Sequence, residues 1–77
     1  MVCDNIRMIR EAKGVTKTHL AKGLGMSLQG YRYLESGQVK LDVERMIRIA
    51  YLLGVKSAVL LDDELTRSII NEIQGNK

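Results

Sequence analysis

Apolar side chains recur at helical spacing along most of the chain. The clearest pattern joins positions separated by three or four residues: Val43, Met46, Ile47, Ala50 and Leu53. No segment alternates between apolar and polar residues over a useful length, so we expect no β-sheet. The pattern therefore predicts an all-α protein.

Glycines separate the helical segments at regular intervals. They are Gly14, Gly25, Gly37 and Gly54. Each is followed within a few residues by a side chain that can cap the next helix: Thr16, Ser27, Asp42 and Ser57. Glycine readily adopts the left-handed backbone that ends a helix, and a hydroxyl or carboxylate oxygen accepts hydrogen bonds from the next helix's first amides. The predicted helices span about residues 4–13, 17–24, 28–36, 43–53 and 58–62.

The last stretch of the chain predicts a sixth helix over about residues 63–74. Asp62 or Asp63 can cap it, and a narrow apolar stripe follows, formed by Leu65, Ile69, Ile70 and Ile73. The stripe can pack against a second copy of the chain or fold back over its own core. We favour the first use, so residues 1–61 are expected to form the main domain and 62–77 a dimerisation element.

Length and composition exclude several classes of protein. A chain of 77 residues has room for one small domain, whose limited core makes self-association favourable. With one cysteine, Cys3, and one histidine, His19, it has no internal disulfide and no Cys/His zinc site. There is no nucleophile–base pair, phosphate loop or paired set of carboxylates, so we expect no enzyme activity and no cofactor. No signal peptide or membrane span is apparent, which predicts a cytoplasmic protein.

Charge is distributed unevenly along the chain. Residues 1–56 carry ten Lys/Arg against five Asp/Glu, a net charge of +5, whereas residues 57–77 carry two against four, a net charge of −2. A basic body with an acidic tail suggests that the body meets phosphates and the tail does not.

The second and third predicted helices form a helix-turn-helix candidate around Gly25-Met26-Ser27. Ala21 supplies a small side chain where the two helices meet, and Gly25 tolerates the left-handed backbone of the turn. Apolar residues that can hold the second helix on the first are Leu20, Met26, Tyr31 and Leu34. Ser27 can cap the second helix and leave its first exposed residues free to face a DNA groove.

Residues 5–61 resemble the phage-repressor-type helix-turn-helix family (Cro/CI, or XRE type). The matching elements, in order, are Arg10-Glu11 before Gly14, Thr16, Leu20-Ala21, Gly25-Met26-Ser27, Glu35-Ser36-Gly37, Ile49-Ala50 and Leu53-Gly54-Val55. The resemblance implies a five-helix lambda-repressor-like domain that binds double-stranded DNA as a homodimer through its third helix. The predicted sixth helix would follow this domain.

The resemblance also implies which residues read base edges. They are the exposed residues of the third helix: Leu28, Gln29, Gly30, Arg32 and Tyr33. Gln29 can bond adenine through two hydrogen bonds, Arg32 can reach guanine or phosphate, and Leu28 can contact a thymine methyl. Gly30 is unfavourable in a helix, so we expect it to permit a close approach of DNA or of a neighbouring helix.

Phosphate contacts are expected from the start of the second helix and from the loop after the third. The candidates are Thr16, Lys17, Ser36, Gln38, Lys40 and Arg45. The chain departs from the family at two positions: Lys17 stands where glutamine is usual, and Leu41 replaces a common proline. Lys17 can still hold a phosphate as a point charge.

The family pattern implies a partly buried ion pair between Arg10 and Glu35, tying the first helix to the third. Together these features predict a sequence-specific transcriptional regulator, a dimeric repressor reading an inverted-repeat operator. The resemblance implies a phage or mobile-element repressor, a restriction–modification controller or an antitoxin, and the sequence does not choose among them. The alternative is a protein–protein module, such as an antitoxin or adaptor. Leu28, Gly30 and Tyr33 favour it because they make the third helix less polar than is usual for a DNA reader.

Overall fold

Local capping signals set most of the helix boundaries in the computed structural model, which describes residues 1–75. The helices, in order, are α1 (Val2–Ala12), α2 (Lys17–Leu24), α3 (Leu28–Glu35), α4 (Val43–Leu53), α5 (Ser57–Leu60) and α6 (Asp63–Gly75). No strand occurs among residues 1–75. The predicted all-α class is confirmed, with the sixth helix present.

Three of the four predicted caps form hydrogen bonds. Thr16 Oγ1 accepts from His19 N at 3.0 Å, Ser27 Oγ from Gly30 N at 3.0 Å, and Asp42 Oδ1 from Arg45 N at 2.7 Å. The fourth prediction, Ser57, is wrong. Ser57 is already the first residue of α5, whose N-cap position is Lys56, and no side chain caps this single-turn helix.

The core is built from the inward faces of α1 to α5. Its fully buried side chains come from four helices and the short α5: Ile6, Ile9, Leu20, Tyr31, Leu34, Ile49 and Leu60. α4 contacts α1, α2 and α5, and α3 contacts α1 and α2. The helix-turn-helix candidate is thus held on a scaffold formed by α1 and α4.

The apolar stripe predicted for α4 is only partly buried. Ala50 and Leu53 lie in the core, together with Ile49, but Val43 and Ile47 are 67% and 52% exposed. Five apolar positions span a wider arc than the neighbouring helices cover, and α4 is rotated so that Ile49 faces inward. Val43 and Ile47 therefore form part of the surface, although they belong to the apolar pattern that predicted the helix.

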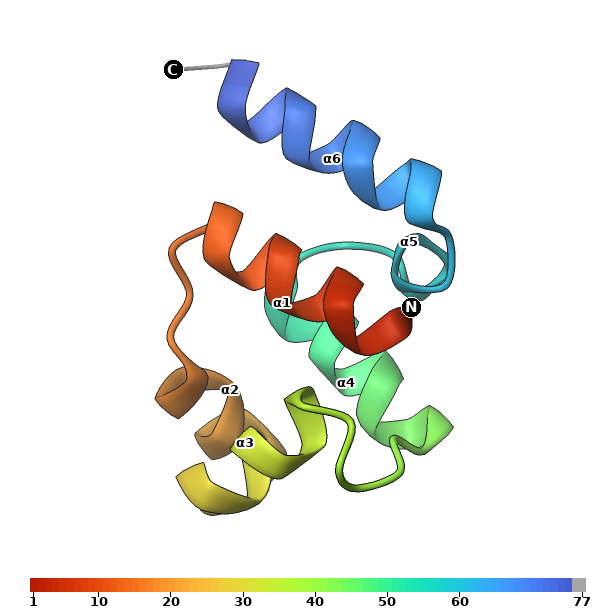
Figure 1. Cartoon of the computed structure of the whole chain (residues 1–77). Helices are drawn as coiled ribbons and strands as arrows, with labels where there is room; N and C mark the ends of the chain where they lie inside the picture. Colours follow the sequence, from red (N-terminus) through yellow and green to blue (C-terminus); the bar gives the residue numbers. More distant parts are fainter. Residues whose placement is uncertain (76–77) are drawn as a thin grey trace.

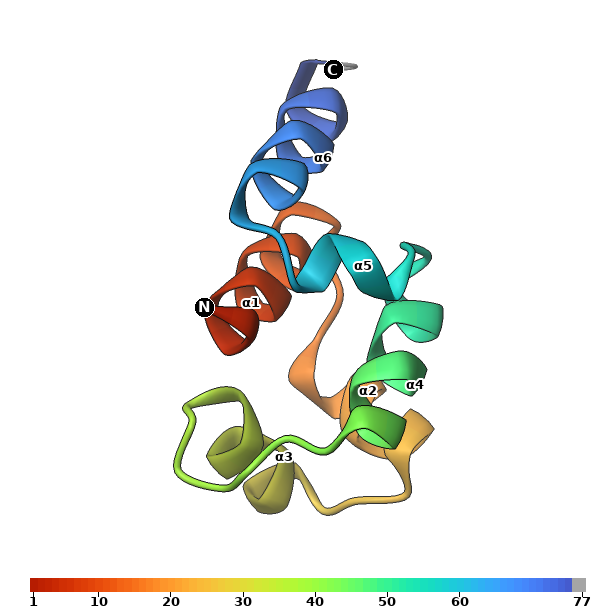
Figure 2. The same cartoon turned by 90° about the vertical axis from the view of Figure 1, so that its right-hand side faces the viewer.

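Helix α6 lies across α1, at the opposite end of the molecule from α3 (Figures 1 and 2). Ile69 and Ile70 pack half-buried against the core, whereas Leu65 stays 45% exposed. The single chain therefore adopts the folded-back alternative. Dimerisation through this stripe stays a prediction.

Polar contacts fix the start of α6. Asp62 Oδ1 accepts hydrogen bonds from Glu64 N at 2.9 Å and Leu65 N at 3.1 Å, so Asp62 is the cap. Thr66 is completely buried, and its hydroxyl donates to the Val59 carbonyl at 2.7 Å. Within the described chain, none of the helices is long and apolar enough to cross a membrane.

Candidate nucleic-acid interface

The turn between α2 and α3 has the geometry that a helix-turn-helix requires. Gly25 has a φ of +68°, a backbone region that favours glycine, and Met26 N donates to the Ala21 carbonyl at 2.9 Å. Ala21 is buried, and a Cβ built on Gly23 would lie 2.5 Å from Leu52 Cδ1. Small residues therefore let α2 approach its neighbours closely and fix the angle at which α3 leaves the turn.

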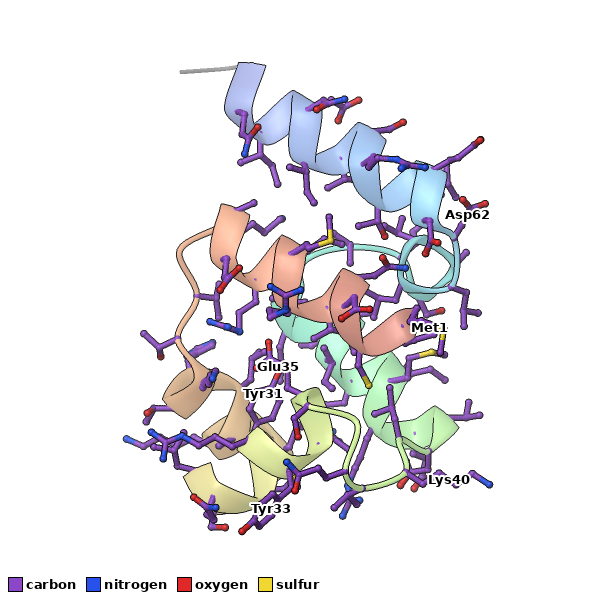
Figure 3. The ribbon with its side chains drawn as sticks, in the orientation of Figure 1. Met1, Tyr31, Tyr33, Glu35, Lys40 and Asp62 are labelled. Carbon is purple, nitrogen blue, oxygen red and sulfur yellow. The ribbon has the colours of Figure 1, made fainter. Side chains whose placement is uncertain are left out.

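Helix α3 divides into a buried and an exposed face. Tyr31 and Leu34 lie in the core with 0% and 1% exposure, whereas Gln29 and Arg32 are exposed. Tyr33 is 41% exposed and lies at the end of the molecule formed by α2 and α3, as Figure 3 shows. Gln29 and Arg32, the two side chains best suited to hydrogen-bond base edges, are thus exposed at the surface.

Leu28 and Gly30 are half-buried at the start of α3. A Cβ on Gly30 would lie 3.2 Å from Ser27 Oγ and 3.5 Å from Met26 Cε. The close approach that we expected of Gly30 is therefore an approach to its own turn, where its amide also donates to Ser27 Oγ. It follows that a larger residue at position 30 would press on the N-terminal cap of α3.

The start of α2 offers a phosphate two kinds of donor. The Thr16 oxygen accepts the capping bond from His19 N, which leaves its hydroxyl hydrogen available for an outside acceptor. Lys17, the first residue of α2, is half-buried and adds a positive charge beside the first backbone amides. Both predicted residues are therefore placed where one phosphate could meet them together.

The other predicted phosphate contacts differ in whether another group of the protein already binds them. Gln38 and Lys40 are exposed in the loop between α3 and α4. The Ser36 hydroxyl donates to the Tyr33 carbonyl at 3.0 Å, so its hydrogen is already used. Arg45 Nη1 lies 3.5 Å from Asp42 Oδ2, and this exposed contact reduces the net charge that Arg45 presents.

An ion pair joins α1 to α3 beneath this surface. Arg10 Nε donates to Glu35 Oε1 at 2.9 Å, and Arg10 Nη1 donates to the Val15 carbonyl at 3.1 Å. The two side chains are only 9% and 4% exposed. Burial, reinforced by the negative charge of Glu35, raises the pKa of the Tyr31 phenol, so Tyr31 stays neutral next to this pair.

The predicted site residues fall into two groups. Those assigned to DNA lie on α2, α3, the following loop and the start of α4, whereas the apolar stripe of α6 lies at the far end of the molecule (Figure 1).

The sequence did not predict the polar contacts that connect α1 to the start of α6. Asn5 is buried on α1, where its Nδ2 donates to the Leu60 carbonyl and to Asp63 Oδ1, both at 3.0 Å. No motif surrounds Asn5 that could have indicated this role.

Two comparisons with known proteins bear on the family. The model of a helix-turn-helix family matches residues 6–60. The chain is also similar to the SPbeta prophage-derived uncharacterized HTH-type transcriptional regulator YonR of Bacillus subtilis (strain 168), with 27% identity over 73 residues, which cover 95% of this chain and 68% of that protein. No solved structure gave a significant match. With the helix-turn-helix geometry described above, these findings confirm the resemblance: the chain belongs to the XRE-type, phage-repressor-like helix-turn-helix family, whose members are DNA-binding transcriptional regulators.

Proposed function

We propose that this protein is a dimeric repressor that reads an inverted-repeat operator in double-stranded DNA through α3. The observation that carries the proposal is the division of α3. Tyr31 and Leu34 anchor the helix in the core, while Gln29 and Arg32 are exposed one turn apart. A helix held in this way can enter a major groove without rearranging the protein.

Base reading is assigned mainly to Gln29 and Arg32. Glutamine bonds adenine, and arginine bonds guanine, each through two hydrogen bonds worth about 1–3 kcal/mol of discrimination. Leu28, Gly30 and Tyr33 would shape the contact: Leu28 against a thymine methyl, Tyr33 against a base or a phosphate. Because Leu28 and Gly30 are half-buried, we expect them to contribute less than Gln29 and Arg32.

Phosphate contacts would set the position of α3 in the groove. Lys17, Lys40 and Arg45 supply the cationic contacts, assisted by Thr16 and Gln38. Ser36 would join them only by exchanging its bond to the Tyr33 carbonyl for one to phosphate. A dimer would then neutralise six phosphates, so the logarithm of affinity should fall with the logarithm of salt concentration at a slope of about −5. Lys17 should contribute more to the affinity for DNA than Arg45, because Arg45 already lies near Asp42.

We assign dimerisation to the α6 stripe, and within it to the part that α1 does not cover. Leu65 is 45% exposed, whereas Ile69, Ile70 and Ile73 are half-buried along the same helix. To reach successive major grooves, the two-fold contact must set the two α3 helices about 34 Å apart, one turn of DNA, and on the same side of the dimer. Leu65→Asp should then reduce self-association and leave the fold intact, since the side chain is not in the core.

Selection of bound duplexes from a random DNA pool, at two salt concentrations, tests the proposal. An inverted repeat with half-sites about ten base pairs apart is the expected outcome. Gln29→Ala or Arg32→Ala should change the preferred bases, whereas Lys17→Ala should weaken binding to all sequences alike.

Two results would contradict the proposal in different ways. Enrichment of a single half-site would contradict the dimer and still support sequence-specific DNA binding. No enrichment even at low salt would contradict DNA binding itself, and it would favour the alternative use of the fold as an antitoxin or adaptor.

A further inference from the structure

A groove of about 1210 Å³ opens at one side of the molecule. It lies between the start of α1, the end of α3, the start of α4 and the α5–α6 junction. Met1 and Asp62 mark it at the right of Figure 3. A groove bordered by several helices is the kind of surface on which an amphipathic polypeptide segment docks.

The floor of this groove is apolar. It is lined by Val2, Leu41, Val43, Met46 and Leu61. Val43 and Leu61 are 67% and 61% exposed, so this apolar lining faces solvent in the single chain. An occupant with its own apolar side chains would remove this surface from water.

The rim of the groove is acidic. Its carboxylates come from α1, the start of α4 and the start of α6: Asp4, Asp42, Asp62, Asp63 and Glu64. Among residues 1–75, Arg7 is the one Lys or Arg side chain in the lining, and it lies 3.7 Å from Asp4. The terminal ammonium of Met1 lies 3.2 Å from Asp63, and Arg45 lies 3.5 Å from Asp42, so the carboxylates still outnumber the cations at the rim. The groove thus carries a charge opposite to that of the rest of the main domain.

Glu35, at the end of α3, also lines the groove. Its Oε1 takes the Arg10 bond, while its Oε2 and the Tyr31 hydroxyl are both buried with no hydrogen-bond partner among the described residues.

We propose that the groove binds an amphipathic, basic segment of another protein, with leucine-like side chains on the floor and Lys or Arg at the rim. The charge of the rim argues against the other possible occupants. A second copy seated on the same groove would place like charges together, and DNA or an anionic lipid surface would be repelled. Because Ser36 lines this groove, a partner bound there would lie next to the predicted phosphate contacts that follow α3.

A pair of labelled model peptides tests this proposal directly. One is an amphipathic helix of leucine and lysine, and the other has glutamate in place of every lysine. Fluorescence anisotropy with the full chain, in the absence of DNA, should show saturable binding of the lysine peptide alone. Equal binding of both peptides, or of neither, would overturn the proposal.

Matched charge reversals locate the site. The double variant Asp4→Lys/Glu64→Lys should weaken the lysine peptide by about tenfold or more, because it places like charges at the rim. The control Asn71→Lys/Glu72→Lys/Gln74→Lys makes the same change in net charge with three exposed residues in the second half of α6, outside the groove. It should change the affinity by less than about twofold, since distant exposed charges are screened by salt. Equal weakening by both variants would mean that the peptide senses only net charge.

A second pair of variants tests the apolar floor without altering charge. Leu61→Ala should weaken the lysine peptide by about fivefold, whereas Tyr51→Ala, at an 82% exposed position on α4 outside the groove, should not. Neither side chain is in the core, so both variants should keep the wild-type melting temperature. If Leu61→Ala changes self-association and not peptide binding, the groove is a contact between copies and the proposal is wrong.

Discussion

The two ends of the molecule are built in different ways. At the α2–α3 end, two eight-residue helices are defined by local signals: the Thr16 and Ser27 caps and the left-handed Gly25. At the α6 end, a thirteen-residue helix is held by contacts with distant parts of the chain, through Asn5 and the buried Thr66. The first end presents polar side chains to the outside, and the second buries polar groups to fix its position.

This difference separates recognition from stability. Exposed residues of α3 can change with little effect on folding, because the capped turn and the buried Tyr31 and Leu34 fix the helix. The α6 end contributes mainly to folding. The Arg10–Glu35 pair lies between the two ends, since α1 contacts both α3 and α6. We therefore expect substitutions at this pair to cost more stability than substitutions at either end.

The largest effect is expected at the buried ion pair. Arg10→Met leaves the Glu35 carboxylate buried without its partner, and should lower the free energy of unfolding by about 3–5 kcal/mol. Urea denaturation monitored by circular dichroism measures the change. The double variant Arg10→Met/Glu35→Leu removes both charges, so it should recover most of the loss. A double variant as unstable as the single one would show that packing, and not the stranded charge, dominates.

The next effect concerns the turn at the DNA end. Gly25→Ala places a Cβ on a residue with a φ of +68°, and should cost about 1–2 kcal/mol of stability. No atom lies within 4 Å of the added Cβ, so backbone strain is the whole cause. Gly75→Ala, at the end of α6, has equal space and no positive φ, and it should leave the melting temperature unchanged. Equal effects in thermal denaturation would contradict this explanation.

A smaller effect is expected at the anchor of α6. Thr66→Val keeps the shape of the side chain and removes its hydrogen bond to the Val59 carbonyl. The loss should be about 1 kcal/mol, because that carbonyl still accepts a bond from Asp62 N. Thr18→Val, on the exposed side of α2, makes the same chemical change and should alter stability by less than about 0.5 kcal/mol. Chemical denaturation of both variants gives the comparison, and equal losses would mean that the buried bond contributes nothing.

The same difference explains what could be predicted from the sequence. The boundaries of α2, α3 and α4 depend on caps and glycines a few residues away, and these were predicted to within one residue. The resemblance to the family also pointed to Arg10 and Glu35. The exposure of Val43 and Ile47 depends instead on which neighbours cover α4, and the burial of Asn5 and Thr66 depends on how α6 meets α1. Such long-range packing leaves no signal in a local pattern.

The smallest expected effect depends on pH and belongs to the α6 end. Hydrogen bonds from Asn5 and from the terminal ammonium of Met1 lower the pKa of Asp63 below its ordinary 3.8. Since the folded-state pKa is the lower one, the ionised carboxylate adds stability above pH ~4, and this contribution is lost as pH falls through the folded pKa. Asp63→Asn should therefore be less stable than the wild type at pH 7, and the stabilities of the two proteins should become equal near pH 2.

Glu72→Gln, which removes an exposed carboxylate from the same helix, is the control and should differ little from the wild type at either pH. Denaturation curves at both pH values measure this, and a deficit of Asp63→Asn that persists at pH 2 would mean that the hydrogen bonds do not depend on the charge.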